Sequence, residues 1–174
     1  MNRTLTRLAL LSVLMVSFAS AAIIYTLTAT LTTVATVPDI IFTTGADTGS
    51  ISGTIGTNGT TFTATNVPLQ VGANVTIEQA VNLTNTDGGS SHDITGAEVA
   101  SEDFGAELNM LSIYVYNGTR YLLISLDDSG DVVYEFSGTL TMPASAEWSM
   151  IIEGCYDDGT VSGTTNTITF NIWQ

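Results

Sequence analysis

The sequence contains no lysine and only three arginines, against seventeen aspartate and glutamate residues, which gives a formal net charge of −14. Arg3 and Arg7 lie near the N-terminus, so Arg120 is the only strong base in the rest of the chain. Proteins that bind nucleic acid or anionic membranes do so with Lys and Arg side chains. The charge therefore excludes both partners, and the absence of lysine excludes a Lys–Asn isopeptide cross-link.

Cysteine and histidine are equally scarce, because Cys155 and His92 are the single examples of each. Cys155 cannot form an internal disulfide, and we expect it to be a small buried residue, with an intermolecular disulfide as the alternative. A metal centre built from His and Cys is excluded, and we expect no cofactor. Nucleophilic catalysis would need His92 as its base, but we expect His92 in an exposed loop. No carboxylate pair stands out for glycan hydrolysis, so we expect no enzyme.

The first 21 residues are typical of a secretory signal. A short basic stretch precedes an apolar run at residues 8–18, and the small residues 19–21 fit a cleavage site. The alternative is an uncleaved membrane anchor. No second long apolar segment follows, so we expect a secreted, extracellular protein that does not insert into a membrane once the signal is removed.

Proline is rare, and helical periodicity is nearly absent. Only residues 97–108 suggest one or two helical turns. Alternation with a period of two dominates, and ten runs are predicted as strands: 22–37, 39–44, 51–57, 60–67, 74–84, 109–116, 119–126, 132–142, 148–154 and 165–173. They predict an all-β domain at residues 38–174, a jelly roll or β-sandwich with two packed sheets.

Two of the connections carry hairpin signals. Asn58-Gly59 and Asn117-Gly118 each separate two strand-like runs. Asn-Gly is favoured in type I′ turns, in which both central residues have positive φ. We therefore predict two type I′ hairpins.

Residues 22–37 are the most distinctive run, because apolar and threonine side chains alternate along it. At ~3.3 Å per residue, such a two-faced strand would extend on the order of 50 Å. Left free, it would expose its apolar face and template aggregation. It either joins its own sheet or completes the sheet of a neighbouring copy as a donor strand. In the second case, the residues expected to fill the acceptor groove are Ile23, Tyr25, Leu27, Ala29 and Leu31.

The signal peptide, the alternating N-terminal strand, the Thr- and Gly-rich β-domain and the final run Phe170-Asn171-Ile172-Trp173-Gln174 together resemble the TasA/camelysin group of biofilm matrix proteins, in particular archaeal relatives that form bundling pili. The resemblance lies in the organisation of the whole mature chain and involves no short motif. It implies a jelly-roll subunit of a head-to-tail homopolymer, lateral bundling and a role in cell–cell cohesion. Some camelysins are described as metalloproteases, but this chain has no His-Glu-x-x-His motif.

Four Asn-x-Ser/Thr triplets are candidate N-glycosylation sites. Asn58 and Asn117 lie at the predicted hairpin tips, and Asn74 and Asn82 alternate with apolar neighbours, which predicts the solvent face of a strand. Threonine is abundant, so chance triplets are the alternative.

Asp127, Asp128 and Asp131 form an acidic turn that is a candidate calcium site. Their spacing does not match an EF-hand loop, and an ordinary polar turn is the alternative.

We therefore expect a secreted filament subunit that assembles by donor-strand complementation. The first alternative is a monomeric cell-surface or S-layer-associated domain that binds envelope glycans, with residues 22–37 in its own sheet. A secreted hydrolase is the second. Aromatic residues on predicted strands either pack in the core or line a sugar-binding face: Trp148, Trp173, Tyr114, Tyr116, Tyr121 and Tyr134.

Overall fold

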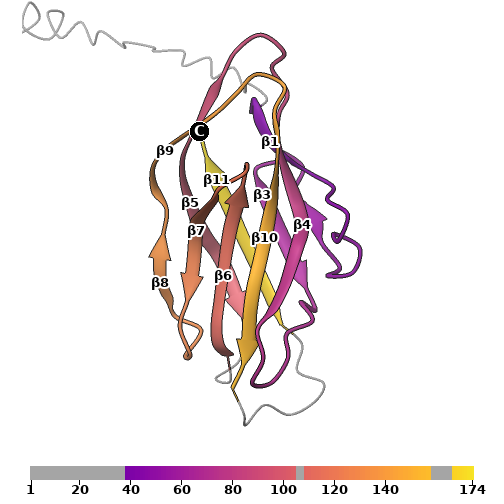
Figure 1. Cartoon of the computed structure of the whole chain (residues 1–174), viewed down its shortest axis with the longest axis vertical. Helices are drawn as coiled ribbons and strands as arrows, with labels where there is room; N and C mark the ends of the chain where they lie inside the picture. Colours follow the sequence, from indigo (N-terminus) through magenta and orange to yellow (C-terminus); the bar gives the residue numbers. More distant parts are fainter. Residues whose placement is uncertain (1–37, 105–107, 158–165) are drawn as a thin grey trace, which may run out of the picture. The chain divides into compact units, whose positions relative to one another are not determined.

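Two antiparallel sheets face each other in a computed structural model that describes residues 38–104, 108–157 and 166–174 (Figure 1). One sheet has six strands, in the order β1 (Ile40–Thr43), β4 (Val75–Asn85), β10 (Glu147–Tyr156), β6 (Leu108–Tyr116), β7 (Arg120–Leu126) and β8 (Val132–Glu135). The other has five, in the order β2 (Thr54–Ile55), β3 (Thr61–Thr65), β11 (Thr167–Trp173), β5 (His92–Asp103) and β9 (Ser137–Met142). The predicted all-β sandwich is confirmed.

The predicted signal peptide at residues 1–21 and the predicted N-terminal strand at residues 22–37 lie outside the described residues. Both stay predictions. Within the described ranges, no helix has the length and apolar character needed to cross a membrane.

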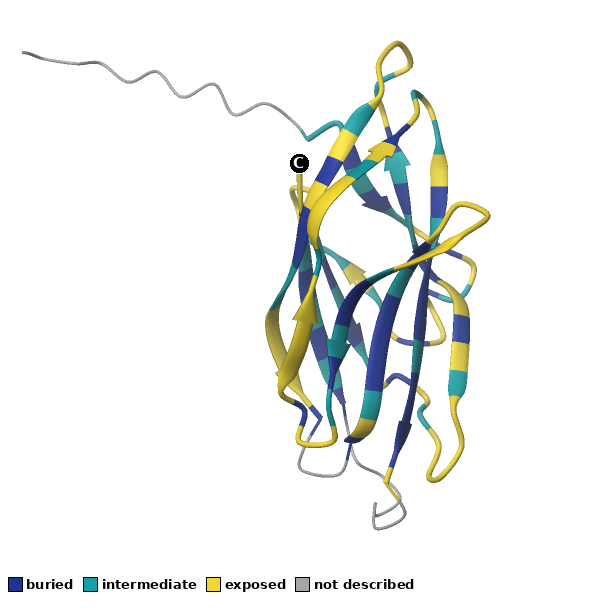
Figure 2. Ribbon diagram, turned by 60° about the vertical axis from the view of Figure 1, so that its left-hand side comes forward, coloured by how far each residue is buried: buried dark blue, intermediate teal, exposed yellow. Residues whose placement is uncertain are grey.

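The period-two pattern of the sequence becomes the two faces of each strand. Along β11, buried and half-buried residues alternate up to its exposed last residue, so that Ile168, Phe170 and Ile172 face the core. Figure 2 shows buried and less buried residues alternating along the strands of the domain. Phe170 meets Phe42 of β1 and Phe62 of β3 with ring centroids 5.5 and 5.6 Å apart, in edge-to-face contacts. These three rings connect the two sheets, because β1 belongs to the six-stranded sheet and the other two strands to the five-stranded one.

Phe170→Ala should lower the free energy of unfolding by about 3–5 kcal/mol, because it removes a buried ring and leaves a cavity between the sheets. Urea unfolding followed by tryptophan fluorescence measures this change. Thr167→Ala on the same strand is the control, and we expect it to cost less than about 1 kcal/mol. Equal losses in the two variants would contradict a core that depends on the aromatic cluster.

The helical turns predicted at residues 97–108 are wrong over residues 97–103, whereas residues 105–107 lie outside the described residues. Residues 92–103 form β5, which pairs with β11 on one side and with β9 on the other. Glu98 lies opposite Asn171, and its carboxylate accepts a hydrogen bond from that amide at 2.9 Å. Pairing on both edges outweighs the weak local preference of this acidic segment for a helix.

The single strand predicted at residues 132–142 is divided between the two sheets as β8 and β9. Phe136 makes the transition, because its amide donates to the carbonyl of Leu123 in β7 at 2.7 Å. Its own carbonyl accepts the amide of Ala97 in β5 at 3.0 Å. Phe136 therefore bonds to the six-stranded sheet through its amide and to the five-stranded sheet through its carbonyl.

Both predicted hairpins form, but the predicted turn type is wrong. Positive φ angles occur at Gly59 (71°) and Gly118 (104°), whereas Asn58 and Asn117 are not among the positive-φ residues. Each asparagine instead accepts, at its side-chain oxygen, the amide two residues further on, Thr60 at 3.1 Å and Thr119 at 3.2 Å. Each turn therefore has one positive φ, at its glycine, and an Asx turn at its asparagine, whereas a type I′ turn has two residues with positive φ.

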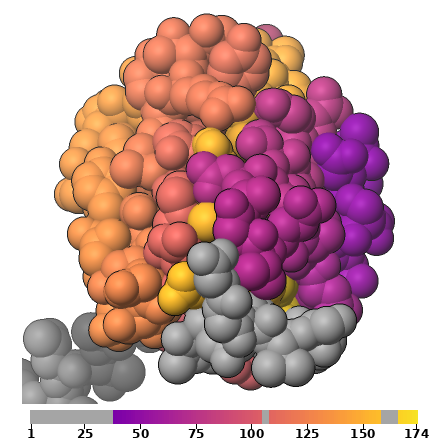
Figure 3. Space-filling model, turned by 60° about the horizontal axis from the view of Figure 1, so that its bottom comes forward, coloured from indigo at the N-terminus to yellow at the C-terminus, as the bar shows by residue number. Residues whose placement is uncertain are grey.

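The side of the sandwich near β1 and β2 is closed by loops. The amide of Phe42 in β1 donates to the carbonyl of Gly59 at 2.6 Å, and the amide of Asp47 donates to the carbonyl of Gln79 in β4 at 3.0 Å. Glycine is required at position 59, because a Cβ there would lie 2.8 Å from Cβ of Ile41. Figure 3 shows these early strands, indigo to magenta, on one side of the molecule and the later strands, salmon to orange, on the other.

Candidate functional site

The last strand, β11, ends beside a groove and contributes Asn171, Ile172 and Trp173 to its lining. Alternation along β11 turns Trp173 away from the core, and the residue is 50% exposed. Its indole lies against Gly96 of β5, where an added Cβ would come within 3.1 Å of Cδ1. The glycine therefore lets the ring rest close to the backbone of β5.

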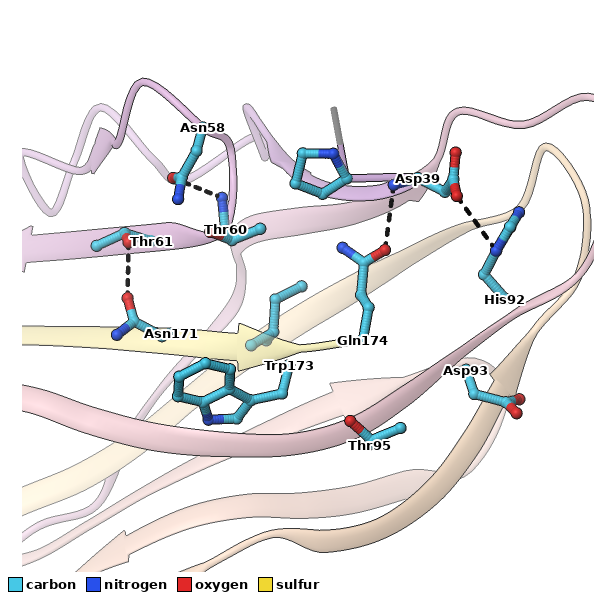
Figure 4. Close-up of a pocket in the computed structure, with 12 residues that line it drawn as sticks. Asp39, Asn58, Thr60, Thr61, His92, Asp93, Thr95, Asn171, Trp173 and Gln174 are labelled. Carbon is cyan, nitrogen blue, oxygen red and sulfur yellow. Dashed lines mark hydrogen bonds and ion pairs between the residues drawn. The ribbon is translucent and has the colours of Figure 1, made fainter. Parts of the chain in front are cut away.

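The groove has a volume of about 620 Å³ (Figure 4). Strands β3, β5 and β11 and the chain just before β1 supply its walls, together with the Asn58 turn. Most of the residues that line it have polar side chains, and the full set is Pro38, Asp39, Asn58, Thr60, Thr61, His92, Asp93, Thr95, Asn171, Ile172, Trp173 and Gln174.

Asn171, one of the residues that line this groove, is held in a fixed orientation. Its side-chain oxygen accepts the hydroxyl of Thr61 at 2.6 Å, and its amide nitrogen donates to Glu98 at 2.9 Å. Because the oxygen and the nitrogen of the amide group are both bonded, its remaining donor and acceptor sites have fixed orientations.

The side chain of Gln174 fastens the start of β1 to the end of β11. Its oxygen accepts the amides of Asp39 and Ile40 at 3.1 and 3.0 Å, and its nitrogen donates to the carbonyl of Ile40 at 2.5 Å. The start of β1 is therefore fixed at the edge of the groove. Sequence reasoning missed this role, because the partners are more than 130 residues apart along the chain.

His92 was predicted in an exposed loop, and this is wrong. It is the first residue of β5, and its side chain is 27% exposed between two carboxylates. Nε2 lies 3.0 Å from Asp87 and Nδ1 lies 3.4 Å from Asp39. The hydrogen bond to Asp87 raises the pKa of His92 above its ordinary value of 6.5. The same hydrogen bond, aided by the Gly89 amide, lowers the pKa of Asp87 from 3.8 to about 2.

This cluster predicts a pH-dependent contribution to stability. The contribution of His92 is complete below its unfolded pKa and is lost as the pH rises through its raised folded pKa. The contribution of Asp87 is present above 3.8 and is lost as the pH falls towards about 2. We therefore expect His92→Gln to lower the melting temperature more at about pH 5.5 than at about pH 9.

Thermal unfolding followed by circular dichroism at the two pH values measures the difference. Asp131→Asn, which removes a carboxylate from the distant β7–β8 turn, is the control and should show no such pattern. An equal effect of His92→Gln at both pH values would contradict a charged His92.

The four Asn-x-Ser/Thr triplets differ in accessibility. Asn58, Asn74 and Asn117 are exposed. Asn82 is half-buried on β4, where its amide nitrogen donates to Glu147 at 3.0 Å and its oxygen is buried without a partner among the described residues. The alternation that suggested a solvent face did not reveal the neighbouring Glu147 on β10.

In a glycosylating host, we expect the folded chain to be modified at Asn58, Asn74 and Asn117 and to remain unmodified at Asn82. The nitrogen that would carry the glycan at Asn82 is engaged with Glu147. Glycopeptide mass spectrometry measures the occupancy of each site. Full occupancy at Asn82 would contradict this difference.

The calcium interpretation of Asp127, Asp128 and Asp131 stays a prediction. One Asp127 side-chain oxygen accepts the amides of Ser129 and Asp131, each at 2.9 Å, as expected of a polar turn. In the described part of the chain, no three His, Cys, Asp or Glu side chains are grouped to hold a metal ion. Cys155 is buried and unpaired, in agreement with the expected small core residue.

A second candidate site is the edge strand β8. All four of its residues are exposed, and the strand is coloured as exposed in Figure 2. Val132, Val133 and Tyr134 are 42%, 59% and 41% exposed. One edge of β8 pairs with β7, and no described strand pairs with the other edge. The strand therefore combines free backbone groups with apolar side chains.

The predicted donor-strand residues Ile23, Tyr25, Leu27, Ala29 and Leu31 lie outside the described residues. Of the two tryptophans, Trp148 is buried in the core, whereas Trp173 lies in the groove. In comparisons with known proteins, the sequence matches no protein-family model and no curated protein.

Proposed function

We propose that this protein is exported and assembles outside the cell as a filament subunit, in which residues 22–37 of one copy add as a strand to β8 of the next. Head-to-tail addition does not close on itself, so it produces a linear homopolymer. Filaments of this kind would promote cohesion between cells.

The observation that carries the proposal is the unprotected edge at β8. Natural edge strands are usually guarded by charged side chains, by proline or by a covering loop. Glu135 is the only charged residue in β8, and its carboxylate accepts the amide of Val99 at 2.8 Å. The acid is thus bonded to β5, and Val132, Val133 and Tyr134 remain exposed along the strand.

The opposite side of the sandwich, near β1, is less suited to accept a strand. There, loop residues bond to the backbone of β1 and β4 through the Phe42–Gly59 and Asp47–Gln79 hydrogen bonds. Strand addition needs free backbone groups. The β8 side of the sandwich is therefore the better acceptor for a donor strand.

The sequence of residues 22–37 suits such an acceptor. As an extended strand, the run would offer its backbone groups to a ladder with β8. Its alternation would place apolar side chains against the valines of β8 and threonine side chains towards solvent. The run contains no charged residue, so the strand brings no additional charge to an acidic partner.

Two variants test both halves of this contact. Leu27→Asp combined with Leu31→Asp should abolish fibres, because it places charge on the apolar face of the donor. Val133→Lys should abolish fibres by placing a charge on the acceptor. A mixture of the two should form one-to-one heterodimers, since one variant keeps a working acceptor and the other a working donor.

Electron microscopy and sedimentation velocity measure these states. Val71→Lys is the matched control for the acceptor, because Val71 is a similarly exposed valine (47%) away from β8, and this variant should form fibres as the parent does. Thr28→Asp is the corresponding control for the donor. Full-length fibres from Val133→Lys would contradict the proposed acceptor. A parent protein that stays monomeric at high concentration would favour the alternative of a monomeric surface domain.

A further inference from the structure

The groove beside Trp173 has no role in the proposed filament contact, which involves β8. Single exposed aromatic residues are common and do not by themselves make a site. Trp173 differs because it borders a groove of about 620 Å³ and is supported from beneath by Gly96. It is a large, rigid apolar surface at a place where a ligand has room.

Hydrogen-bonding groups surround this indole. Asn171 is fixed by Thr61 and Glu98, and Asp93 is oriented by the hydroxyl of Thr141, which donates to it at 2.6 Å. Among the described residues, the hydroxyls of Thr60 and Thr95 have no hydrogen-bond partner. The groove therefore offers amide, carboxylate and hydroxyl groups beside one aromatic face.

The charges of the groove indicate which ligands it accepts. No lysine or arginine lines it, whereas Asp39 and Asp93 do. The one basic side chain, His92, is already held between Asp39 and Asp87. An anionic ligand such as a phosphate, a sulfate or a uronic acid would be repelled here and by the net charge of the whole chain.

We propose that this groove binds a neutral oligosaccharide. The apolar face of a sugar ring would stack on Trp173, and its hydroxyls would bond to Asn171, Asp93 and Thr95. The saccharide has two possible sources, a glycan attached to Asn58, which itself lines the groove, or a polysaccharide from outside. The binding does not depend on the proposed filament.

Isothermal titration tests the proposal with neutral tetrasaccharides of glucose, mannose, galactose and N-acetylglucosamine as probes, and with tetragalacturonate as the acidic probe. The protein is the full chain made in a host that does not glycosylate it, so that Asn58 stays in place without a glycan, and it carries Leu27→Asp and Leu31→Asp, which keep it dispersed. At least one neutral probe should bind, at least tenfold more tightly than tetragalacturonate. Failure of every neutral probe, or equal binding of the acidic one, would overturn the proposal.

In the same background, Trp173→Ala should weaken binding at least tenfold. Tyr116→Ala is the matched control, because Tyr116 is a similarly exposed aromatic residue (44%) on the other sheet, and it should leave binding unchanged. Thr95→Val tests the hydroxyl without loss of volume and should weaken binding several-fold. Binding by Trp173→Ala as tight as that of the parent would overturn the site.

Producing the same protein in a glycosylating host distinguishes the two sources. Weaker probe binding by the Asn58-glycosylated protein would assign the groove to its own glycan. Equal binding would assign it to an external saccharide. Either result supports the groove as a saccharide site.

Discussion

Two open sheets leave four edge strands, and the backbone groups on each edge need a partner or some protection. In this protein, the early edges, β1 and β2, are short, and loops bond to the backbone beside them. The later edges arise from one continuous segment that passes from β8 to β9 through Phe136. Because Phe136 bonds to both sheets, the segment ties them together on that side while leaving the outer edge of β8 free.

The aromatic cluster explains how the short edge strand β1 is held in place. Phe42 lies in a strand of only four residues, yet its ring packs against Phe62 and Phe170 from the opposite sheet. The packing of buried rings holds β1 in place where few ladder hydrogen bonds do. The loop carrying Gly59 then approaches β1 closely enough to bond to it.

The fold was largely predictable because burial imposes a period of two, which is visible in a single sequence. The run ending in Ile168, Phe170 and Ile172 is an example. Residues 97–103 were assigned wrongly because their acidic side chains obscure the alternation, and only pairing with β11 and β9 makes them a strand. The switch at Phe136 was also missed, since it depends on partners in two other strands. Local sequence does not carry that information.

The candidate sites were less predictable, for the same reason. Trp173 was recognised as a residue for either the core or a sugar-binding face, and its place beside Gly96 favours the second. The contacts of Gln174 with the start of β1 join the two ends of the domain. The carboxylates around His92 come from before β1 and from the loop before β5. Contacts between such distant segments leave no periodic signal.

The scarcity of bases connects the two proposed sites. Arg120, the only Lys or Arg among the described residues, lies 3.3 Å from Glu153 and 3.5 Å from Glu78, so it is already paired within its own sheet. Copies of so acidic a chain repel each other, and physiological salt screens this repulsion only beyond about 8 Å. In the proposed filament, association would therefore come from uncharged contacts, which the backbone edge and valines of β8 offer and the uncharged run at residues 22–37 would complement. The same scarcity of bases supports the saccharide proposed for the groove, because an acidic surface with one exposed indole favours ligands that carry hydroxyl groups and no negative charge.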